Sequence, residues 1–307
     1  MMSLVVIGTM AFDSLETPFG KAERIIGGAA TYIGLSASRF MKDIQLVSII
    51  GEDFPQDYLA DLRTRGINTD GVELVEGEKS FFWSGRYHND MNTRDTLDTQ
   101  LNVLANFNPI VPEGGLNADF LMLGNLTPSV QLSVIKQMAK RPKLIVMDTM
   151  NFWMEIALDD LKTTIKEVDV LSINDEEARL LSGEYSLVKA AKVILAMGPR
   201  VLIIKKGEHG ALLFNEKEVF FAPALPLEEV FDPTGAGDTF AGGFIGYLAA
   251  TEDISFDNMK RAVIYGSAMA SFCVEKFGTE RLISLKQNEV DNRVKQFIDL
   301  TSVEISF

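Results

Sequence analysis

The sequence predicts an α/β protein in which helices cover both faces of a doubly wound, mostly parallel central sheet, with a small β lid attached. Two patterns carry this prediction. Short apolar runs recur at wide intervals, as in strands buried on both faces, and helix-like stretches separate them, which favours a parallel sheet. The expected strands are Leu4–Ile7, Leu144–Met147, Val168–Ile173 and Val201–Ile204, and the expected helices are Ala29–Phe40, Tyr58–Thr64, Ser129–Lys140, Glu176–Leu181 and Leu187–Met197.

The stretch Lys79–Tyr87 departs from this pattern. Phe81, Trp83 and Tyr87 alternate with polar residues, as in an antiparallel strand with one face in water. We interpret this stretch as part of a lid made of residues 12–26 and 73–106, carried by a single domain over residues 1–307. An ordinary edge hairpin is the alternative.

Composition narrows the classes of function. The 29 Lys and Arg residues against 43 Asp and Glu residues give a formal charge of −14, which argues against a nucleic-acid partner. The single cysteine, Cys273, excludes an internal disulfide and a cysteine-based zinc site, and it favours the reducing cytoplasm. With no signal-peptide pattern at the start and no apolar run of membrane-spanning length, we expect no membrane partner.

The most informative stretch is Asp232–Phe240, which reads Asp-Pro-Thr-Gly-Ala-Gly-Asp-Thr-Phe. Gly235, Ala236 and Gly237 stand at the expected start of a helix, where free backbone amides and the helix dipole attract an anion. A carboxylate beside such a hole would repel the anion, so Asp238 suits a base that accepts a proton from an attacking hydroxyl. The pattern therefore indicates phosphoryl transfer.

Two further expectations concern this helix. Its N-terminus is expected to lower the pKa of Asp238, and its apolar residues recur at i, i+4 and i+8, as on one face of an amphipathic helix. A glycine-rich turn in which Asp238 only stabilises the helix start is the alternative. The apolar residues are Phe240, Phe244 and Leu248, and a strand is expected upstream at Val219–Ala222.

Rival phosphate-binding motifs are absent from the sequence. It contains no P-loop, no H-R-D or D-F-G motif of the protein kinases, and no third glycine of a dinucleotide fingerprint, whose place Phe240 takes.

The stretch Asp232–Phe240 resembles the C-terminal signature of the ribokinase-like (PfkB-type) carbohydrate kinases. Other segments resemble motifs of that family in the same order along the chain: Gly8 with Asp13, Gly27-Gly28, Gly51-Glu52-Asp53-Phe54, Gly66-Ile67, Asn174-Asp175-Glu176-Glu177 and Lys206-Gly207-Glu208-His209-Gly210-Ala211.

The resemblance implies an ATP- and magnesium-dependent kinase that phosphorylates a hydroxymethyl group of a sugar or sugar acid. It implies Asp238 as the base and residues 235–238 as the anion hole. It also implies the following sets: Asp13, Gly27, Gly28 and Arg94 for the substrate; Asn174, Glu177, Lys205, Gly207 and Gly210 for the nucleotide; Glu177 for Mg²⁺ through water; and Asp232 with Thr234 for a monovalent cation such as K⁺.

Several interpretations stay open. Tyr32 stands where a sugar-binding Asn is expected, so a nucleoside kinase is the first alternative, with Tyr32, Phe82 and Trp83 stacking a base. A sugar or nucleotide sensor without activity is the second. Lys205 either lends a cation to a phosphate or caps a strand, and from the residues alone Arg94 is expected at the surface.

Aromatic residues raise two more expectations. Phe152 and Trp153, with Met147, Met150 and Met154, are expected to pack in the core, with a substrate wall as the alternative. The apolar face of the lid strand must be covered by the acceptor, another strand or a second subunit, and we expect a homodimer through the lid.

Overall fold

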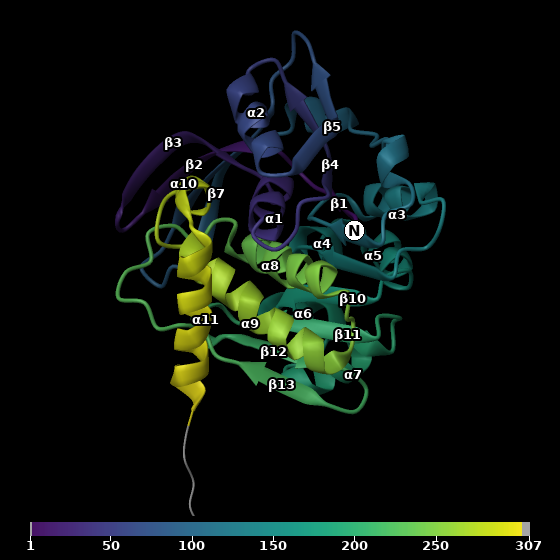
Figure 1. Ribbon diagram of the computed structural model, residues 1–307, viewed down its shortest axis with the longest axis vertical. Coiled ribbons are helices and arrows are strands. Elements are labelled where there is room, and N and C mark those ends of the chain that lie inside the picture. Colours follow the sequence, from purple (N-terminus) through teal and green to yellow (C-terminus); the bar gives the residue numbers. More distant parts are fainter. Residues whose placement is uncertain (1, 303–307) are drawn as a thin grey trace, which may run out of the picture.

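The central sheet organises the computed structural model, which describes residues 2–302 (Figure 1). Its nine strands lie in the order β13-β12-β11-β10-β9-β8-β1-β4-β5. All neighbours from β11 to β5 pair in parallel, whereas β12 pairs antiparallel with β11 and β13 pairs antiparallel with β12. The strands are β1 (Leu4–Ile7), β4 (Ile44–Gly51), β5 (Ile67–Val75), β8 (Phe120–Leu123), β9 (Leu144–Asp148), β10 (Val170–Asn174), β11 (Val201–Lys205), β12 (Ala211–Phe214) and β13 (Val219–Ala222).

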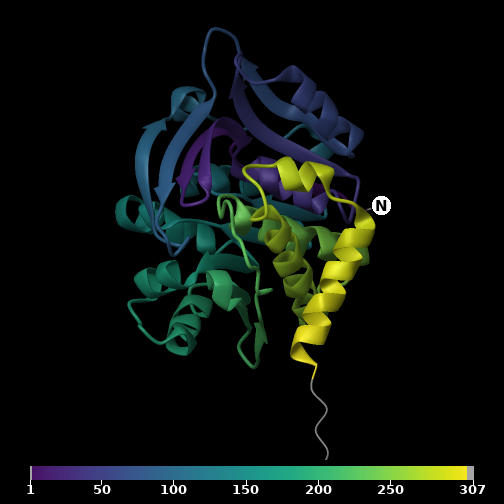
Figure 2. The same cartoon turned by 90° about the vertical axis from the view of Figure 1, so that its left-hand side faces the viewer.

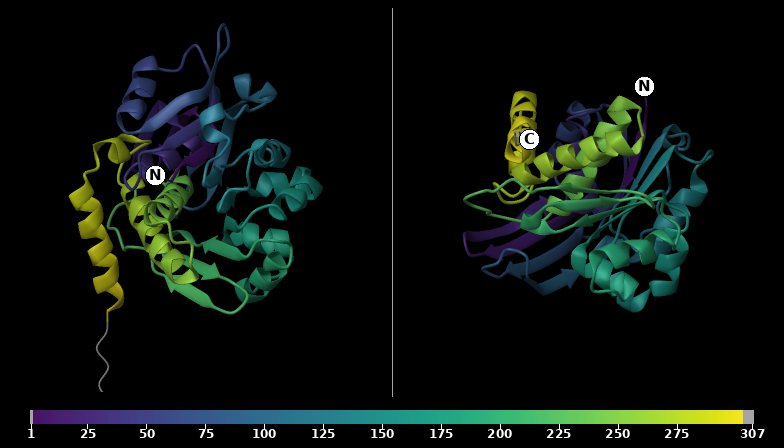
Figure 3. Two further views of the ribbon diagram at one scale, coloured as in Figure 1. Left: turned by 45° about the vertical axis from the view of Figure 1, so that its right-hand side comes forward. Right: turned by 90° about the horizontal axis from the view of Figure 1, so that it is seen from below.

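Helices cover both faces of this sheet, as Figure 3 shows from below. One face carries α1 (Ala29–Ala37), α2 (Gln56–Thr64), α8 (Ala236–Thr251), α9 (Phe256–Cys273), α10 (Glu280–Ser284) and α11 (Gln287–Thr301). The other face carries α3 (Pro128–Gln137), α4 (Asn151–Ile156), α5 (Leu158–Ile165), α6 (Asp175–Ser182) and α7 (Leu187–Leu195). Short 3₁₀ turns occupy Asn102–Asn106, Glu113–Gly115 and Gly207–His209.

Alternate residues of each strand enter two separate cores. On β1, Leu4 and Val6 pack with α1 and α8, whereas Val5 and Ile7 pack with the helices of the opposite face, and all four are fully buried. Because both faces are covered, the strand reads as a continuous apolar run. The predicted fold class is thus confirmed, and each expected strand and helix is present, with its ends shifted by at most three residues.

The expectation of an amphipathic α8 was wrong. Its residues from Thr239 to Gly246 are buried all round, because α8 lies between α1 and α9 (Figure 1). Glycines allow this close approach: a Cβ at Gly242 would collide with the carbonyl of Ile33, and one at Gly243 would stand 3.0 Å from Gly266 of α9.

Four strands form a second sheet, the lid, in the order β3-β2-β6-β7. They are β2 (Ala11–Thr17), β3 (Gly20–Gly27), β6 (Phe81–Tyr87) and β7 (Arg94–Gln100). Figure 2 shows β2 and β3 beside β6 and β7 despite their separation in the sequence. The pairs β2–β3 and β6–β7 are antiparallel hairpins, and β2 joins β6 in parallel. Residues 73–75, which we expected in the lid, belong instead to β5 of the central sheet.

Asp53, which follows β4, ties both halves of the lid to the central sheet. Its Oδ1 accepts hydrogen bonds from the backbone N–H and the Oγ–H of Ser80, at the start of β6. Its Oδ2 pairs at 2.6 Å with Arg24 of β3, whose guanidinium also stacks over the ring of Phe12. The lid therefore has a fixed anchor at the end of β4.

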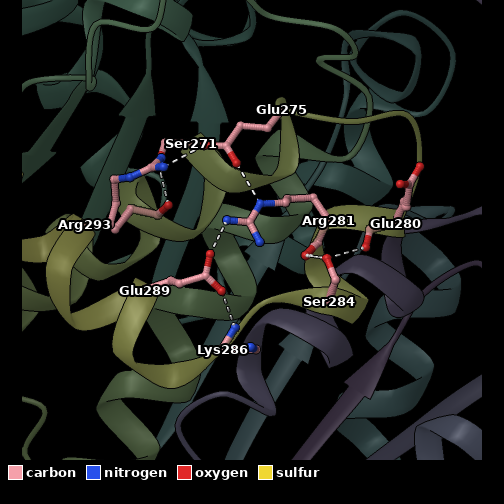
Figure 4. Close-up of polar contacts among 9 residues, drawn as sticks. Ser271, Glu275, Glu280, Arg281, Ser284, Lys286, Glu289 and Arg293 are labelled. Atoms are coloured by element: carbon pink, nitrogen blue, oxygen red, sulfur yellow. Dashed lines mark hydrogen bonds and ion pairs between the residues drawn. The ribbon is translucent and has the colours of Figure 1, made fainter.

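The C-terminal helices are joined by an ion-pair network (Figure 4). Glu275 accepts from Arg281 at 2.7 Å and from Arg293 at 2.6 Å, and both guanidiniums contact the ring of Phe272. Arg293 of α11 also donates to Oγ of Ser271 on α9. This network fixes the C-terminal end of α9. Within residues 2–302, no helix is long and apolar enough to cross a membrane.

Candidate active site

Two adjoining cavities open where the parallel strands end and α8 begins. The larger has a volume of about 700 Å³ and lies between the lid and the strand ends, and the smaller has about 570 Å³ and lies between the 207–210 loop and α9. Lys205, Pro233 and Gly237 line both cavities. Ligands of doubly wound sheets bind at this edge, so the two cavities form one candidate site with two chambers.

The start of α8 provides free backbone donors between the chambers. Gly235 precedes the helix at φ 75°, and a Cβ there would collide with the ring of Tyr32. The N–H of Ala236 donates to the carbonyl of Pro233, whereas those of Gly237 and Asp238 have no acceptor within the described chain. A Cβ at Gly237 would lie 3.1 Å from Nζ of Lys205. Two amides and one ammonium group thus converge, which suits an anion.

Asp238 carries an unusual carboxyl group. Burial raises its pKa to about 7, and the charge of Asp148 adds to the rise against the opposing pull of Lys205. The sequence-based expectation of a lowered pKa was wrong, because desolvation and a like charge outweigh the helix dipole. A carboxyl with a pKa near neutrality is well matched to accept a proton at that pH.

An ion pair lies beside Asp238. Lys205 ends β11, and its Nζ is 2.7 Å from Oδ2 of Asp148, which ends β9. Burial lowers the pKa of Lys205, but the carboxylates of Asp148 and Glu177 outweigh burial and raise it. Lys205 therefore stays charged at the junction of the chambers, and it does more than cap a strand.

Asn174 and Glu177 form a capping box at the start of α6. Oδ1 of Asn174 accepts from the N–H of Glu177, and Oε2 of Glu177 accepts from the N–H of Asn174, both at 2.8 Å. Both residues line the larger cavity. Burial raises the pKa of Glu177 to about 7, with Lys205 opposing the shift.

These groups fit a magnesium ion held through water. Residues 2–302 contain no cluster of three or more His, Cys, Asp or Glu side chains that could enclose a metal. Mg²⁺ normally keeps several waters and binds through one or two carboxylates and substrate phosphates. Glu177, with a carboxylate at the cavity wall, has the donor type that such a site needs.

The predicted substrate residues meet at the lid side of the larger cavity. Asp13 lies on β2, and its pKa is raised to about 8 by burial and by the charges of Asp232 and Asp238. A Cβ at Gly27 would collide with the carboxylate of Asp13. Gly28, at φ 93°, is the N-cap of α1 and lies at the cavity wall. Arg94 is exposed, as expected from the residues alone, and it also lines this cavity, with its guanidinium 6.0 Å from the ring centre of Trp83.

Asp232 is buried behind the start of α8. Its Oδ1 accepts from the N–H of Thr234 at 2.8 Å, and its Oδ2 accepts from the N–H of Gly278 at 2.9 Å. Each carboxylate oxygen keeps a second lone pair, so the group retains the chemistry of a cation ligand. Thr234 Oγ donates to the hydroxyl of Tyr87 at 3.1 Å, which joins the lid to this loop.

The smaller cavity is built around two glycines with positive φ. Gly207 (φ 55°) and Gly210 (φ 81°) shape the turn after β11, and the tip of the β6–β7 hairpin faces them across the cavity. Apolar side chains form much of the remaining wall, among them Leu225, Leu227, Val230 and Val274. His209 is exposed on the turn. A flat apolar group with a phosphate tail suits this chamber.

Comparison with known proteins decides the family. Residues 2–285 match the model of the pfkB family of carbohydrate kinases. The chain belongs to this family. It is 31% identical over 251 residues to a cytidine kinase of Thermococcus kodakarensis, covering 80% of this chain and 88% of that one. It is 25% identical over 303 residues to a ribokinase of Bacillus subtilis, covering 91% and 92% of the two chains.

A solved structure shares the fold of this kinase. The nucleoside kinase of Methanocaldococcus jannaschii superposes with a TM-score of 0.76 at 20% identity, over 96% of this chain and 99% of that one. The pfkB kinases act on carbohydrates and nucleosides with ATP, so the chain is a sugar or nucleoside kinase of this family.

The lid forms part of the wall of the larger cavity. Phe81, Trp83 and Tyr87 all line the larger cavity, as their alternation predicts. Phe82 points the other way and packs against the core, so its expected place beside a base was wrong. The apolar face of β6 thus faces the cavity.

Other wall residues were missed or misjudged from the sequence. Met147 and Met154 are buried in the core as expected. Met150, Phe152 and Trp153 line the cavity instead, because they follow the end of β9 and turn over the strand ends. Asn125 and Phe107 were not singled out. Asn125 stands just beyond the end of β8, and that position was its one available signal.

Proposed function

We propose that this kinase transfers the γ-phosphoryl group of ATP to the 5′-hydroxyl group of a nucleoside. The observation that carries the proposal is the wall of the larger cavity, which we assign as the acceptor chamber. Aromatic side chains line it from three segments: Phe81 and Trp83 of the lid, Phe107 after the 3₁₀ turn Asn102–Asn106, and Phe152 and Trp153 beyond the end of β9. Flat apolar faces are suited to a nucleobase, whereas a bare sugar or sugar acid would need polar groups in their place.

Similarity supports the same choice. The relative from Thermococcus kodakarensis is named for cytidine, and the chain matches it over most of its length. We therefore favour the nucleoside alternative over the first expectation from the sequence, a sugar or sugar acid as acceptor. An inactive sensor is not favoured, because Asp238 and the glycines before it keep the geometry that phosphoryl transfer needs.

In the proposed mechanism the acceptor lies between Asp13 and Asp238. Asp13, Gly27 and Gly28 would hold the ribose hydroxyls, and the 5′-hydroxyl would donate its hydrogen bond to Asp238. Phosphoryl transfer passes through a loose transition state, so positioning and charge stabilisation contribute most. Asp238 would take the proton of the hydroxyl as the new P–O bond forms and the bond between the γ-phosphorus and the β,γ-bridging oxygen breaks, with ADP as the leaving group.

The donor would lie across the junction of the chambers. The N–H groups of Gly237 and Asp238, with the ammonium group of Lys205, would stabilise the charge on the transferred group. Gly207 and Gly210 would allow the nucleotide to lie close to the backbone, and Arg94 would reach the phosphates from the lid. Magnesium, when bound through waters at Asn174 and Glu177, would neutralise phosphate charge.

Three further parts belong to this proposal. A monovalent cation such as K⁺ would bind at Asp232 and Thr234. A homodimer would form through the lid at the free edge of β7, whose seven residues are all exposed, because the apolar face of β6 faces the cavity and would be covered by the acceptor. The cytoplasm, where ATP is available, would be the compartment.

The test is a panel of acceptors with purified protein, ATP and Mg²⁺, measured as ADP release. Cytidine, uridine, adenosine and inosine are compared with ribose and sugar acids at equal concentration. The proposal expects at least one nucleoside to exceed every bare sugar in kcat/KM, and its 5′-deoxy analogue to be inert. A sugar or sugar acid as the best acceptor, with all nucleosides inactive, would refute it.

A further inference from the structure

Asn125 is a polar residue beside the aromatic part of the acceptor chamber wall that Phe152 and Trp153 form. It follows β8, is half-buried, and lies beside Met150 and Trp153 of the next strand end. No step of the proposed phosphoryl transfer uses it. Its carboxamide therefore needs another explanation.

The orientation of this carboxamide is fixed by its neighbour. The indole Nε1–H of Trp153 can only donate, and it lies 2.8 Å from Oδ1 of Asn125. The oxygen must therefore face the indole. The amino group then faces Met150, where Nδ2 lies 3.0 Å from the thioether sulfur, a weak acceptor.

Counting the remaining hydrogen-bonding capacity shows what Asn125 offers to a ligand. Oδ1 has two lone pairs and uses one for Trp153. Nδ2 has two N–H bonds and uses one on Met150, with no further acceptor in residues 2–302. One good donor and one good acceptor thus remain on a single rigid amide at the cavity wall. A ligand that leaves them unpaired on binding would lose affinity.

We propose that Asn125 reads the hydrogen-bonding edge of the nucleobase and so determines which nucleosides this kinase accepts. This inference rests on the proposed nucleoside kinase activity. A base edge presents a ring N–H or ring nitrogen next to an exocyclic oxygen or amino group, which pairs with the donor and acceptor of an amide. Phe152 and Trp153, adjacent to Asn125, would contact the face of the same base.

The decisive variant is Asn125→Asp, which replaces the donor with a second acceptor at nearly unchanged volume. A carboxylate accepts from the exocyclic amino group of cytosine and repels the carbonyl oxygen of uracil. We expect the ratio of kcat/KM for cytidine to that for uridine to rise about 10- to 100-fold, the range of one hydrogen bond lost or gained at a buried site. Adenosine and inosine form the equivalent purine pair.

A matched control is Asn215→Asp in the β12–β13 turn, far from both cavities. Its Oδ1 accepts from the N–H groups of Lys217 and Glu218, and a carboxylate keeps both bonds, so neither activity nor the ratio should change. A second variant, Trp153→Phe, keeps an aromatic ring but removes the N–H that orients the amide. In this variant the ratio of kcat/KM for cytidine to that for uridine should lie closer to one than in the wild type.

Binding gives a readout that is independent of turnover. The chain has two tryptophans, Trp83 and Trp153, and both line the acceptor chamber, so intrinsic fluorescence reports acceptor binding without ATP. The Kd ratio for cytidine and uridine should shift in Asn125→Asp as the kinetic ratio does.

The outcomes separate the two claims. If the wild type phosphorylates no nucleoside, the proposed function fails. If it does, and Asn125→Asp leaves both ratios within twofold of the wild type while melting at the same temperature, the assignment of Asn125 is overturned. If Asn125→Asp does not fold, Asn125→Ser is used in its place. In that variant kcat/KM for nucleosides should fall about 10-fold or more. An equal loss of kcat/KM for ribose and for nucleosides would overturn the assignment.

Discussion

Replacing Asp238 by Asn should remove activity and at the same time stabilise the protein above neutral pH. The change is nearly isosteric and removes only the proton acceptor. We expect kcat to fall by about 10²- to 10⁴-fold, the usual contribution of a positioned base. The gain in stability follows from the raised pKa of the carboxyl group, because the folded chain must hold this charge in a partly buried site.

The size of the stability effect follows from the pKa of Asp238. This pKa is about 7 in the folded protein against an ordinary value of 3.8, so the folded chain binds the proton more tightly than the unfolded chain. Wild-type stability relative to the variant therefore falls as pH rises from 3.8 to 7, by at most about 4 kcal/mol. Between pH 5.5 and 8.5 the difference is about 2 kcal/mol, which we reduce to about 1 kcal/mol because cavity water screens the partly exposed carboxylate.

Two measurements check this reasoning. The melting temperature of Asp238→Asn minus that of the wild type should grow by about 2–4 °C between pH 5.5 and 8.5. In the wild type, kcat/KM at saturating Mg²⁺ should rise with pH through about 7. Asp148→Asn should move this rise in kcat/KM to lower pH, because the charge of Asp148 contributes to the raised pKa of Asp238.

A difference in melting temperature that stays constant over this pH range would refute the stability prediction. A rise of kcat/KM with pH that Asp148→Asn leaves at the same pH would refute the assignment of that rise to Asp238 and would mean that it reflects the titration of ATP. An Asp238→Asn variant with more than half of the wild-type kcat would move the base to another residue.

Three further changes test other parts of the site. Gly237→Val should abolish turnover with little change in melting temperature, because the side chain would stand in the space beside Lys205 where the phosphoryl group meets the backbone; normal activity in a folded variant would contradict the anion hole. Glu177→Gln should raise the magnesium concentration needed for half-maximal rate, and an unchanged magnesium titration would remove Glu177 from the metal site. Phe81→Ser with Trp83→Ser should raise KM for the acceptor without changing the oligomer, as light scattering would report, and a loss of dimer together with a normal KM would mean that this face serves assembly alone.

The parts of the fold that follow from local pattern were predictable. Buried parallel strands must be apolar throughout, so runs such as Leu4–Ile7 identify them without tertiary information. The stretch Asp232–Phe240 was readable for a similar reason, since a helix start, its glycines and its carboxylate are contiguous in the chain.

Properties that depend on neighbours distant in the sequence were not predictable. The pKa of Asp238, in α8, is raised by burial and by the charge of Asp148 at the end of β9, which no local pattern reveals. Asn125 becomes informative only when the fold brings Trp153 beside it. The burial of α8 depends on two flanking helices, so the spacing of its apolar residues described only part of its surroundings.

The connectivity of the lid has a consequence for the order of folding. The ladder between β2 and β6 pairs residues from Ala11↔Phe81 to Glu16↔Arg86, and the side chains of Arg86 and Glu16, 70 residues apart, meet across it. During synthesis the β2–β3 hairpin leaves the ribosome well before its partner hairpin, because α1, β4, α2 and β5 lie between them in the chain. Closing so long a loop is entropically costly unless the central sheet has already brought its ends together. The acceptor chamber is therefore completed late in folding, and the β2–β6 ladder should be among the first elements to exchange its amide hydrogens from the native state.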